Sequence, residues 1–221
     1  MSTAIIILTL DEIDGVRAIV PKLNNDWAEE IIFVDGGSKD GTIEEAKKLG
    51  FKVIHQNNKG EGNACRIGVE KTNSDYIMFF SPDGNDEPKA IPQMISKISE
   101  GFDIVHISRF GKHSESRDAG PFDRFGNRMF TFLVNVFFGG NYSDALNGFR
   151  IIRRDVMLKL KTDAQKLNIE QQISIRAAKK NLKIFEIYGR EPKRIGGERK
   201  MKPIPTGVSL SAQIIKEFIY W

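Results

Sequence analysis

The chain has 221 residues, of which 40% are hydrophobic and 28% charged, and its formal net charge is +4. This composition excludes a disordered or low-complexity chain, and the length favours one large α/β domain. The longest nearly apolar stretch runs from Met129 to Phe138, which is shorter than the roughly 20 residues that span a membrane. A single cysteine, Cys65, excludes an internal disulfide. Because no positively charged segment precedes the first apolar run, we expect no signal peptide and a cytoplasmic protein.

The first part of the chain alternates short apolar strands with helices. Strands are predicted at 4–10, 30–34, 52–55 and 75–80, and helices at 11–23, 40–49 and 63–71. This alternation is typical of right-handed βαβ units and a parallel sheet, whose ligands bind outside the carboxyl ends of the strands. We therefore expect Asp11, Asp35 and Asp83, which follow three of the strands, to lie along one edge of the sheet.

After Pro88 the pattern is less regular. Helices are predicted at 89–99, 124–138, 169–180 and 208–221, strands at 103–107, 145–152 and 183–187, and a polar loop at 111–120. No internal repeat and no long linker marks a second domain.

Two turns that follow strands carry residues that ligand sites use. Asp83 and Asn85 are two residues apart in a Pro/Gly turn, and oxygen ligands at this spacing reach a Mg²⁺ or Mn²⁺. The same residues are equally suited to a simple turn without a ligand. Asp35 stands in a glycine-rich turn, which is either structural, with Asp40 capping the next helix, or a contact with a base or ribose.

Six short motifs together resemble the family 2 glycosyltransferases, which have the GT-A fold. They are Thr9-Leu10-Asp11-Glu12 and the segments 34–42, 58–64, 81–85, 147–150 and 194–200. The last two are similar to elements of the dolichyl-phosphate (polyprenyl-phosphate) mannose synthase group. The resemblance implies a Rossmann-like, mostly parallel sheet flanked by helices. It would form a domain at 1–205, with a nucleotide-sugar half at 1–88 and an acceptor half at 89–205, followed by an amphipathic helix at 206–221.

The resemblance also implies roles for individual residues. Contacts with the nucleotide are implied for Leu8, Thr9, Leu10, Glu12, Asp35, Gly37, Lys59, Gly60, Arg66 and Ser81. Asp83 corresponds to the second acidic residue of the Asp-x-Asp metal motif, and Asn85 to a nearby ligand of Mn²⁺ or Mg²⁺. Contacts with the donor diphosphate or the acceptor phosphate are implied for Arg109, Arg124, Arg150, Arg194 and Lys200.

The chain departs from the family pattern at three positions. Ser81 stands at the first acidic position of the metal motif, which removes one negative charge and is expected to weaken metal binding. Gly36 replaces a second carboxylate beside the nucleotide. Asp11 stands where asparagine is usual, which is a mild change.

The start of the late helix bears on the acceptor. Family members that glycosylate a sugar hydroxyl commonly have a Glu-Asp pair there, and this chain has Glu170-Gln171. A glutamine amide does not accept a proton at neutral pH, and a hydroxyl acceptor needs a positioned base. A phosphate monoester, with a second pKa of about 6, is already a nucleophilic dianion. A lipid phosphate acceptor is therefore favoured. If the acceptor is instead a sugar hydroxyl, Glu170 or Asp144 would be the base.

Three segments leave alternatives open. The aromatic helix is predicted to serve as core, as an interfacial helix that reaches a lipid head group, or as a contact in a homodimer. Its apolar residues are Phe122, Phe125, Met129, Phe130, Phe132, Leu133, Phe137 and Phe138. The same alternatives hold for the C-terminal helix with Phe218, Tyr220 and Trp221. Residues 190–202, with six basic and two acidic side chains, are either a solvated loop or a clamp for phosphate or an acidic membrane surface.

We therefore predict an inverting, metal-dependent glycosyltransferase that moves a hexose from GDP-mannose or UDP-glucose to polyprenyl phosphate. Its catalytic residues would be Asp83, Arg124, Arg150, Arg194 and Glu170, and it would be cytoplasmic with peripheral membrane contact. One alternative is a transferase that acts on a sugar hydroxyl in surface-polysaccharide assembly. Another is a non-catalytic nucleotide-sugar-binding protein, and a nucleic-acid binder is not expected because no motif supports it.

Overall fold

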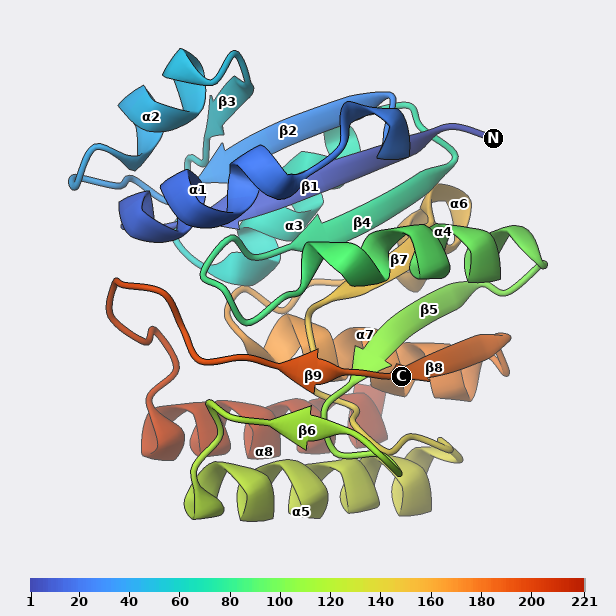
Figure 1. Ribbon diagram of the computed structural model, residues 1–221. Helices are drawn as coiled ribbons and strands as arrows, with labels where there is room; N and C mark the ends of the chain where they lie inside the picture. The colour runs from blue at the N-terminus through green and yellow to red at the C-terminus, as the bar shows by residue number, and fades with distance from the viewer. Residues whose placement is uncertain (221) are drawn as a thin grey trace.

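A seven-stranded sheet with helices on both faces forms the centre of the computed structural model, which describes residues 1–220 (Figure 1). Its strands are, in spatial order, β3 (Lys52–His55), β2 (Glu30–Asp35), β1 (Thr3–Thr9), β4 (Tyr76–Phe80), β7 (Arg150–Arg153), β5 (Ile104–Ser108) and β8 (Ile184–Tyr188). The predicted mostly parallel sheet is confirmed: only β7 runs antiparallel to its neighbours β4 and β5 among the described strands.

Alternate residues of the central strands face two apolar layers. Ile5 and Ile7 of β1 pack with α1 (Ile13–Ile19), α2 (Thr42–Lys48) and α4 (Ile91–Ser99). Ala4 and Ile6 pack with α3 (Glu61–Glu70), α6 (Arg154–Leu160) and α7 (Asn168–Lys179). Because β1 is buried on both faces, its continuous apolar run is the pattern expected of a central parallel strand.

Two predicted elements differ from those observed. The helix predicted at 11–23 ends as α1 at Ile19, and the 3₁₀ turn Val20–Lys22 follows, because Pro21 has no amide hydrogen to continue the α-helix. The strand predicted at 145–152 begins only at Arg150. Upstream of it, the side-chain amide of Asn147 donates to the carbonyl of Ile107 at 2.7 Å in place of a backbone ladder.

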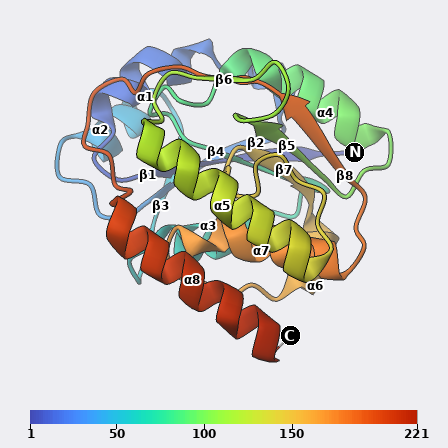
Figure 2. The ribbon, with the colours of Figure 1, turned by 90° about the horizontal axis from the view of Figure 1, so that it is seen from below.

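Two long helices form a further layer beyond α7. Figure 2 shows α5 (Pro121–Phe138) and α8 (Pro203–Tyr220) side by side and running in the same direction. They follow two short paired strands, β6 (Glu115–Ser116) and β9 (Arg190–Glu191). Both helices begin earlier than predicted, and Trp221, the last predicted interfacial aromatic residue, lies outside the described residues. Within residues 1–220, no helix is long and apolar enough to cross a membrane.

Candidate active site

A cleft of about 1070 Å³ opens at the carboxyl ends of β1 and β4. Its walls come from the segments after these strands, the starts of α3 and α7, the basic segment near residue 194, and helices α5 and α8. The turn after β4 lies directly against α1, since a Cβ on Gly15 would come within 2.3 Å of the carbonyl oxygen of Pro82. Only glycine allows this approach, which brings the turn with Asp83 close to Glu12.

Arg194 joins the two sides of this part of the cleft. Its Nη1 lies 2.7 and 2.9 Å from the carboxylate oxygens of Glu12, and its Nη2 donates to Asp83 at 2.6 Å. The segment around Arg194 is also tied to the turn by its backbone, because the Ile195 amide donates to the Asp83 carbonyl at 2.7 Å. Although Arg194 opposes the effect, burial raises the pKa of Glu12.

The turn after β4 supplies oxygen donors of the kind that Mg²⁺ and Mn²⁺ bind. Asp83 has a carboxylate and Asn85 an amide oxygen, and a hard cation of this type keeps water and substrate phosphates as its other ligands. Within residues 1–220, no group of three His, Cys, Asp or Glu side chains is arranged to hold a metal ion. Asp83 and Asn85 thus offer two oxygen donors to such a cation. For Asp83 to ligate it through both oxygens, Arg194 must move away.

Sequence reasoning missed Asp86 in the same turn. Its carboxylate accepts the backbone amide of Ser81 at 2.8 Å, so the turn keeps a second acidic side chain although Ser81 carries none. Burial raises the pKa of Asp86 well above its usual value, and the negative charge of Asp83 adds to this effect. The position of Asp86 three residues after Asp83 is the signal that could have found it.

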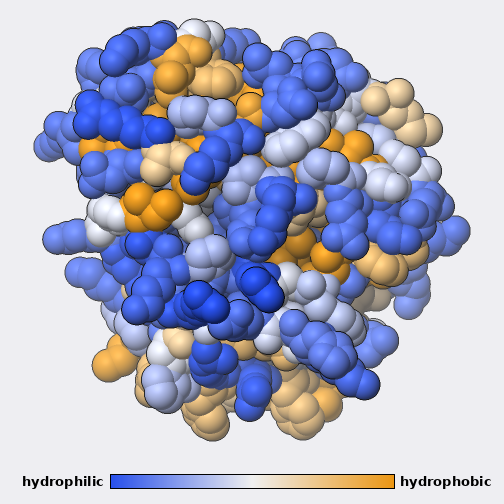
Figure 3. Space-filling model, in the orientation of Figure 1, coloured by the Kyte–Doolittle hydropathy of each residue, from blue (hydrophilic) through white to orange (hydrophobic). Residues whose placement is uncertain are grey.

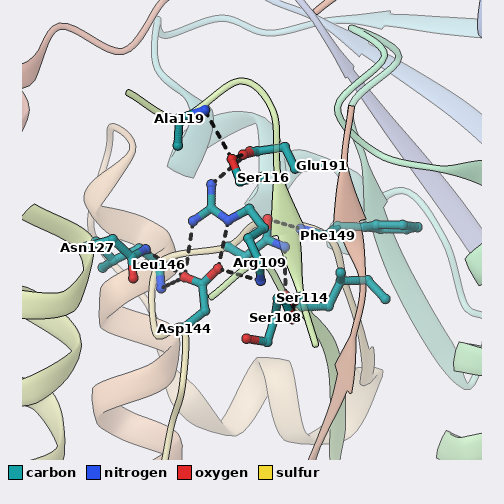
Figure 4. A network of polar contacts seen from close by, with 12 residues as sticks. Ser108, Arg109, Ser114, Ser116, Ala119, Asn127, Asp144, Leu146, Phe149 and Glu191 are labelled. Atoms are coloured by element: carbon teal, nitrogen blue, oxygen red, sulfur yellow. Dashed lines mark hydrogen bonds and ion pairs between the residues drawn. The ribbon is translucent and has the colours of Figure 1, made fainter. Parts of the chain in front are cut away.

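Arg109 is held by two carboxylates at the cleft wall (Figure 4). It donates to Asp144 at 2.7 and 3.1 Å and to Glu191 at 3.1 Å, and Asn127 donates to Asp144 at 2.7 Å. Although burial alone would raise it, the Arg109 guanidinium lowers the pKa of Asp144 to about 2. Asp144 is fully buried, is paired with Arg109 and does not line the cleft, so its position argues against Asp144 as a base.

Glu170 lies at the floor of the cleft, in the first turn of α7. It is 3% exposed, and one of its oxygens is 2.8 Å from a guanidinium nitrogen of Arg150. Glu61, which sequence reasoning also missed, lies beside it at the start of α3. The sequence signal for Glu61 is its place inside the motif at 58–64.

The structure brings together twelve of the predicted site residues along the cleft. They are Leu8, Thr9, Leu10, Glu12, Gly60, Ser81, Asp83, Asn85, Arg109, Glu170, Arg194 and Lys200. The others do not line it: Asp35, Gly37, Lys59, Arg66, Arg124 and Arg150. Arg150 pairs with Glu170 and donates to the carbonyl of Asn147, and both of these residues line the cleft.

Three of these other residues hold loops instead. The Asp35 carboxylate accepts the Thr9 hydroxyl at 3.0 Å and the backbone amides of Gly37 and Ser38 at 2.8 Å each, which fixes its own turn. Arg66 donates to the carbonyl of Ala164 at 2.6 Å. Arg124 donates to backbone carbonyls before α5, one of them that of Ala119 at 3.1 Å. In this arrangement their polar groups stabilise loops of the protein, and their contacts with a ligand stay a prediction.

Comparison with known proteins agrees with this architecture. Residues 4–160 match the family described as Glycosyl transferase family 2. The chain is 26% identical over 203 residues to Glycosyltransferase AglJ of Haloferax volcanii, covering 90% of this chain and 66% of AglJ. It is 26% identical over 215 residues to Dolichyl-phosphate hexose transferase of the same organism, covering 96% and 92%. The chain thus spans just under two thirds of AglJ.

Among solved structures, glucosyl-3-phosphoglycerate synthase from Mycobacterium tuberculosis, in complex with Mn²⁺, uridine-diphosphate and phosphoglyceric acid, has a TM-score of 0.75. The sequence identity is 20%, and the match covers 99% of this chain and 77% of that one. The predicted GT-A fold is confirmed by this likeness.

Proposed function

This chain belongs to glycosyl transferase family 2 and is a glycosyltransferase, and we propose that it moves a hexose from a nucleoside-diphosphate sugar to a polyprenyl phosphate at a membrane surface. The relative named Dolichyl-phosphate hexose transferase, which matches over 96% of this chain, supports this acceptor class. The observation that carries the proposal is the continuity of the charged cleft with an exposed apolar face on α5 and α8.

The two helices are turned with their apolar sides outward. We call this surface the α5–α8 face; its exposed residues are Phe122, Phe125, Phe132, Val136, Phe137, Ile204, Val208, Ile215, Phe218, Ile219 and Tyr220. The apolar surface along the lower edge of the molecule in Figure 3 lies where Figure 1 places these helices. Meanwhile α8 buries Gln213 and Glu217 against the protein. A helix with an outward apolar side is suited to the interfacial region of a bilayer.

The cleft connects this face with the basic segment. Phe125 of α5 and Val208 of α8 line the cleft, and so do Arg194, Arg199 and Lys200. A lipid phosphate requires both surroundings, because its prenyl chain is apolar and its head group is a dianion. The basic side chains would hold the phosphate, and the apolar walls would accompany the chain toward the bilayer.

The proposed reaction is a displacement with inversion at the anomeric carbon. An oxygen of the acceptor phosphate forms a bond to this carbon while the bond to the diphosphate oxygen breaks, and the nucleoside diphosphate leaves with the electron pair. Arg194 and Lys200 would neutralise and align the two phosphate groups. A Mg²⁺ or Mn²⁺ held by Asp83 and Asn85 would supply further positive charge to the leaving diphosphate.

Nucleotide release tests the proposal. GDP-mannose and UDP-glucose are each incubated with the protein and Mn²⁺, with and without vesicles that contain a polyprenyl phosphate. We expect release that depends on the lipid phosphate and is lost in Asp83→Ala and Arg194→Ala. Arg17→Ala, which removes an exposed ion pair with Glu45, serves as the control. Nucleotide release at the same rate with and without the polyprenyl phosphate would contradict the proposal.

A second candidate acceptor is a sugar hydroxyl, with Glu170 as the base. It is favoured by one observation: burial raises the pKa of Glu170, although Arg150 opposes this, and the side chain lines the cleft. Transfer to a saccharide acceptor that is abolished in Glu170→Gln would support this candidate over the lipid phosphate.

A further inference from the structure

We propose that Glu61 and Glu170 form the subsite for the donor sugar at the floor of the cleft, and that this carboxyl pair selects neutral hexoses against uronic acids. The inference rests on the proposed function only in that the donor is a nucleoside-diphosphate sugar. It assigns a role to Glu61 and names the class of sugar.

The two carboxyl groups face the same spot in the cleft. Glu61 and Glu170 both line it, and the charge of Glu170 acts on the Glu61 carboxyl. A Cβ placed on Gly148 would lie 3.3 Å from Oε1 of Glu170 and 3.7 Å from Oε1 of Glu61. Since Gly148 has no side chain, both carboxyl groups lie close to its backbone, and their free oxygens border the cleft.

The backbone at the start of α3 fixes the position of Glu61. The amide of Gly62 donates to the carbonyl of Gln165 at 3.0 Å, and a Cβ on Gly62 would lie only 2.1 Å from the carbonyl oxygen of Ala164. Arg66 of α3 holds the same Ala164 carbonyl. The segment before α7 and the start of α3 are therefore locked together, and this contact places Glu61 beside Glu170.

The pair has unused hydrogen-bonding capacity. Glu170 is 3% exposed, and apart from the Arg150 ion pair its oxygens have no hydrogen-bond partner within residues 1–220. Burial raises the pKa of Glu61 well above its usual value, and the neighbouring Glu170 adds to this. The carboxyl oxygens of Glu170 are therefore left to accept hydrogen bonds from a ligand. Sugar hydroxyls are matching partners, because each both donates and accepts.

The charge of the pair also excludes one class of sugar. Glu170 pairs with the buried guanidinium of Arg150, whereas Glu61 has no cation partner within residues 1–220, and the charge of Asp83 also acts on Glu61. The carboxylate of a uronic acid would meet like charges in a poorly solvated place, which is unfavourable. A neutral hexose meets no such repulsion.

Calorimetric binding separates the sugar from the nucleotide. The titrants are UDP, UDP-glucose and UDP-glucuronate, and in parallel GDP, GDP-mannose and GDP-mannuronate, each with Mn²⁺. For the wild-type protein we expect the uronate to bind at least about tenfold more weakly than the neutral sugar of the same nucleotide. In Glu61→Gln, affinity for the neutral nucleotide sugar should fall about tenfold, whereas affinity for the bare nucleotide should stay unchanged. The ratio of the affinities for the neutral sugar and the uronate of the same nucleotide should decrease.

The matched control is Glu70→Gln, which makes the same change at the exposed far end of α3 and should alter none of these affinities. Glu170→Gln tests the second member of the pair by the same titrations. Its melting temperature is also measured, because the substitution removes the ion-pair partner of Arg150. The inference is overturned if Glu61→Gln and Glu170→Gln bind the nucleotide sugar as the wild type does, if uronates bind equally well, or if neither nucleotide sugar binds. If only the proposed acceptor is wrong, lipid-dependent nucleotide release will be missing while the differences in donor affinity persist.

Discussion

The guanidinium of Arg194 lies 2.6 Å from the carboxylate of Asp83, although the two residues are 111 positions apart in the chain. The same side chain also reaches Glu12 at 2.7 Å. Two acidic groups that would otherwise repel each other are thus neutralised by one cation from the segment after β9. This internal cation lies at the carboxylate that a divalent metal would use, so metal and arginine compete for Asp83.

The first prediction concerns this competition. In Arg194→Gln, Asp83 and Glu12 lose their positive partner, so Mn²⁺ should bind the protein without nucleotide several-fold more tightly than it binds the wild type. Electron paramagnetic resonance of free Mn²⁺ during titration measures this affinity. Arg17→Gln removes an exposed arginine from its pair with Glu45 and is the control. A lower Mn²⁺ affinity in Arg194→Gln would show that arginine and metal do not share the site.

The second prediction is the acid sensitivity of the Arg109–Asp144 pair. The folded-state pKa of Asp144 is about 2 because of Arg109, although burial opposes the effect, and its unfolded value is about 3.9. A lowered folded pKa adds stability above the unfolded pKa, and this stability is lost as the pH falls toward 2. The contribution at neutral pH is about 2 kcal/mol.

Urea unfolding between pH 2 and 7 measures this contribution. The difference in free energy of unfolding between the wild type and Asp144→Asn should be largest above pH 4 and shrink below it. Asp155→Asn, at an exposed ion pair with Lys159, is the control; because Lys159 also lowers the pKa of Asp155, its difference should shrink in the same direction but stay much smaller. A difference that does not change with pH would contradict the assignment.

The third prediction concerns the attachment of α8. Glu217 is fully buried and pairs with Arg176, which is 2% exposed, at 2.8 Å, and Gln172 and Gln213 also donate to it. Removing one partner of a buried pair leaves the other poorly compensated, so Glu217→Ala should lower the free energy of unfolding by about 3–5 kcal/mol.

Chemical denaturation measures this loss. The double variant Glu217→Met with Arg176→Met removes both charges and should recover much of it, because an apolar pair has no desolvation cost. Lys216 lies on the same helix as Glu217 and forms an exposed pair with Asp163, which precedes α7. Lys216→Ala should cost less than about 1 kcal/mol. Equal losses in Glu217→Ala and Lys216→Ala would contradict the buried role.

The parts of the fold predicted best from sequence are those that local pattern determines. The apolar run of β1 and the turns after β2 and β4 are short and continuous, so the parallel sheet and the edge that carries Asp83 follow from them. Antiparallel β7 was not predicted, because its direction depends on which strand edges remain free once β4 and β5 are placed, and not on its own residues.

Side-chain direction at the site is the part that sequence did not determine. Ligand contacts of Arg66 and Arg124 are implied by the family resemblance, yet their donors bind backbone carbonyls. Glu61 lies within the motif at 58–64, but its place beside Glu170 depends on a glycine-mediated contact between segments about a hundred residues apart. Such long-range contacts depend on packing, for which one sequence has no periodic signal.

The last prediction tests the α5–α8 face. Phe132 and Ile219 are each 63% exposed on this face and do not line the cleft. Burying such side chains in a bilayer contributes about 1.5–3 kcal/mol each, so Phe132→Ser with Ile219→Ser should lower partitioning onto anionic vesicles at least about tenfold. Co-sedimentation with vesicles measures the partitioning, and the melting temperature should stay nearly unchanged because both side chains are exposed.

Leu158→Ser is the matched control, because Leu158 is 48% exposed on α6, outside the α5–α8 face. It should leave vesicle binding intact. Sedimentation velocity of the wild type and the double variant distinguishes the remaining possibility. If the wild type is a dimer that the double variant converts to a monomer, while vesicle binding is unaffected, then the apolar face pairs two copies of the chain and the membrane role is wrong. If both proteins are monomers and only vesicle binding falls, the outward apolar sides of α5 and α8 face the bilayer.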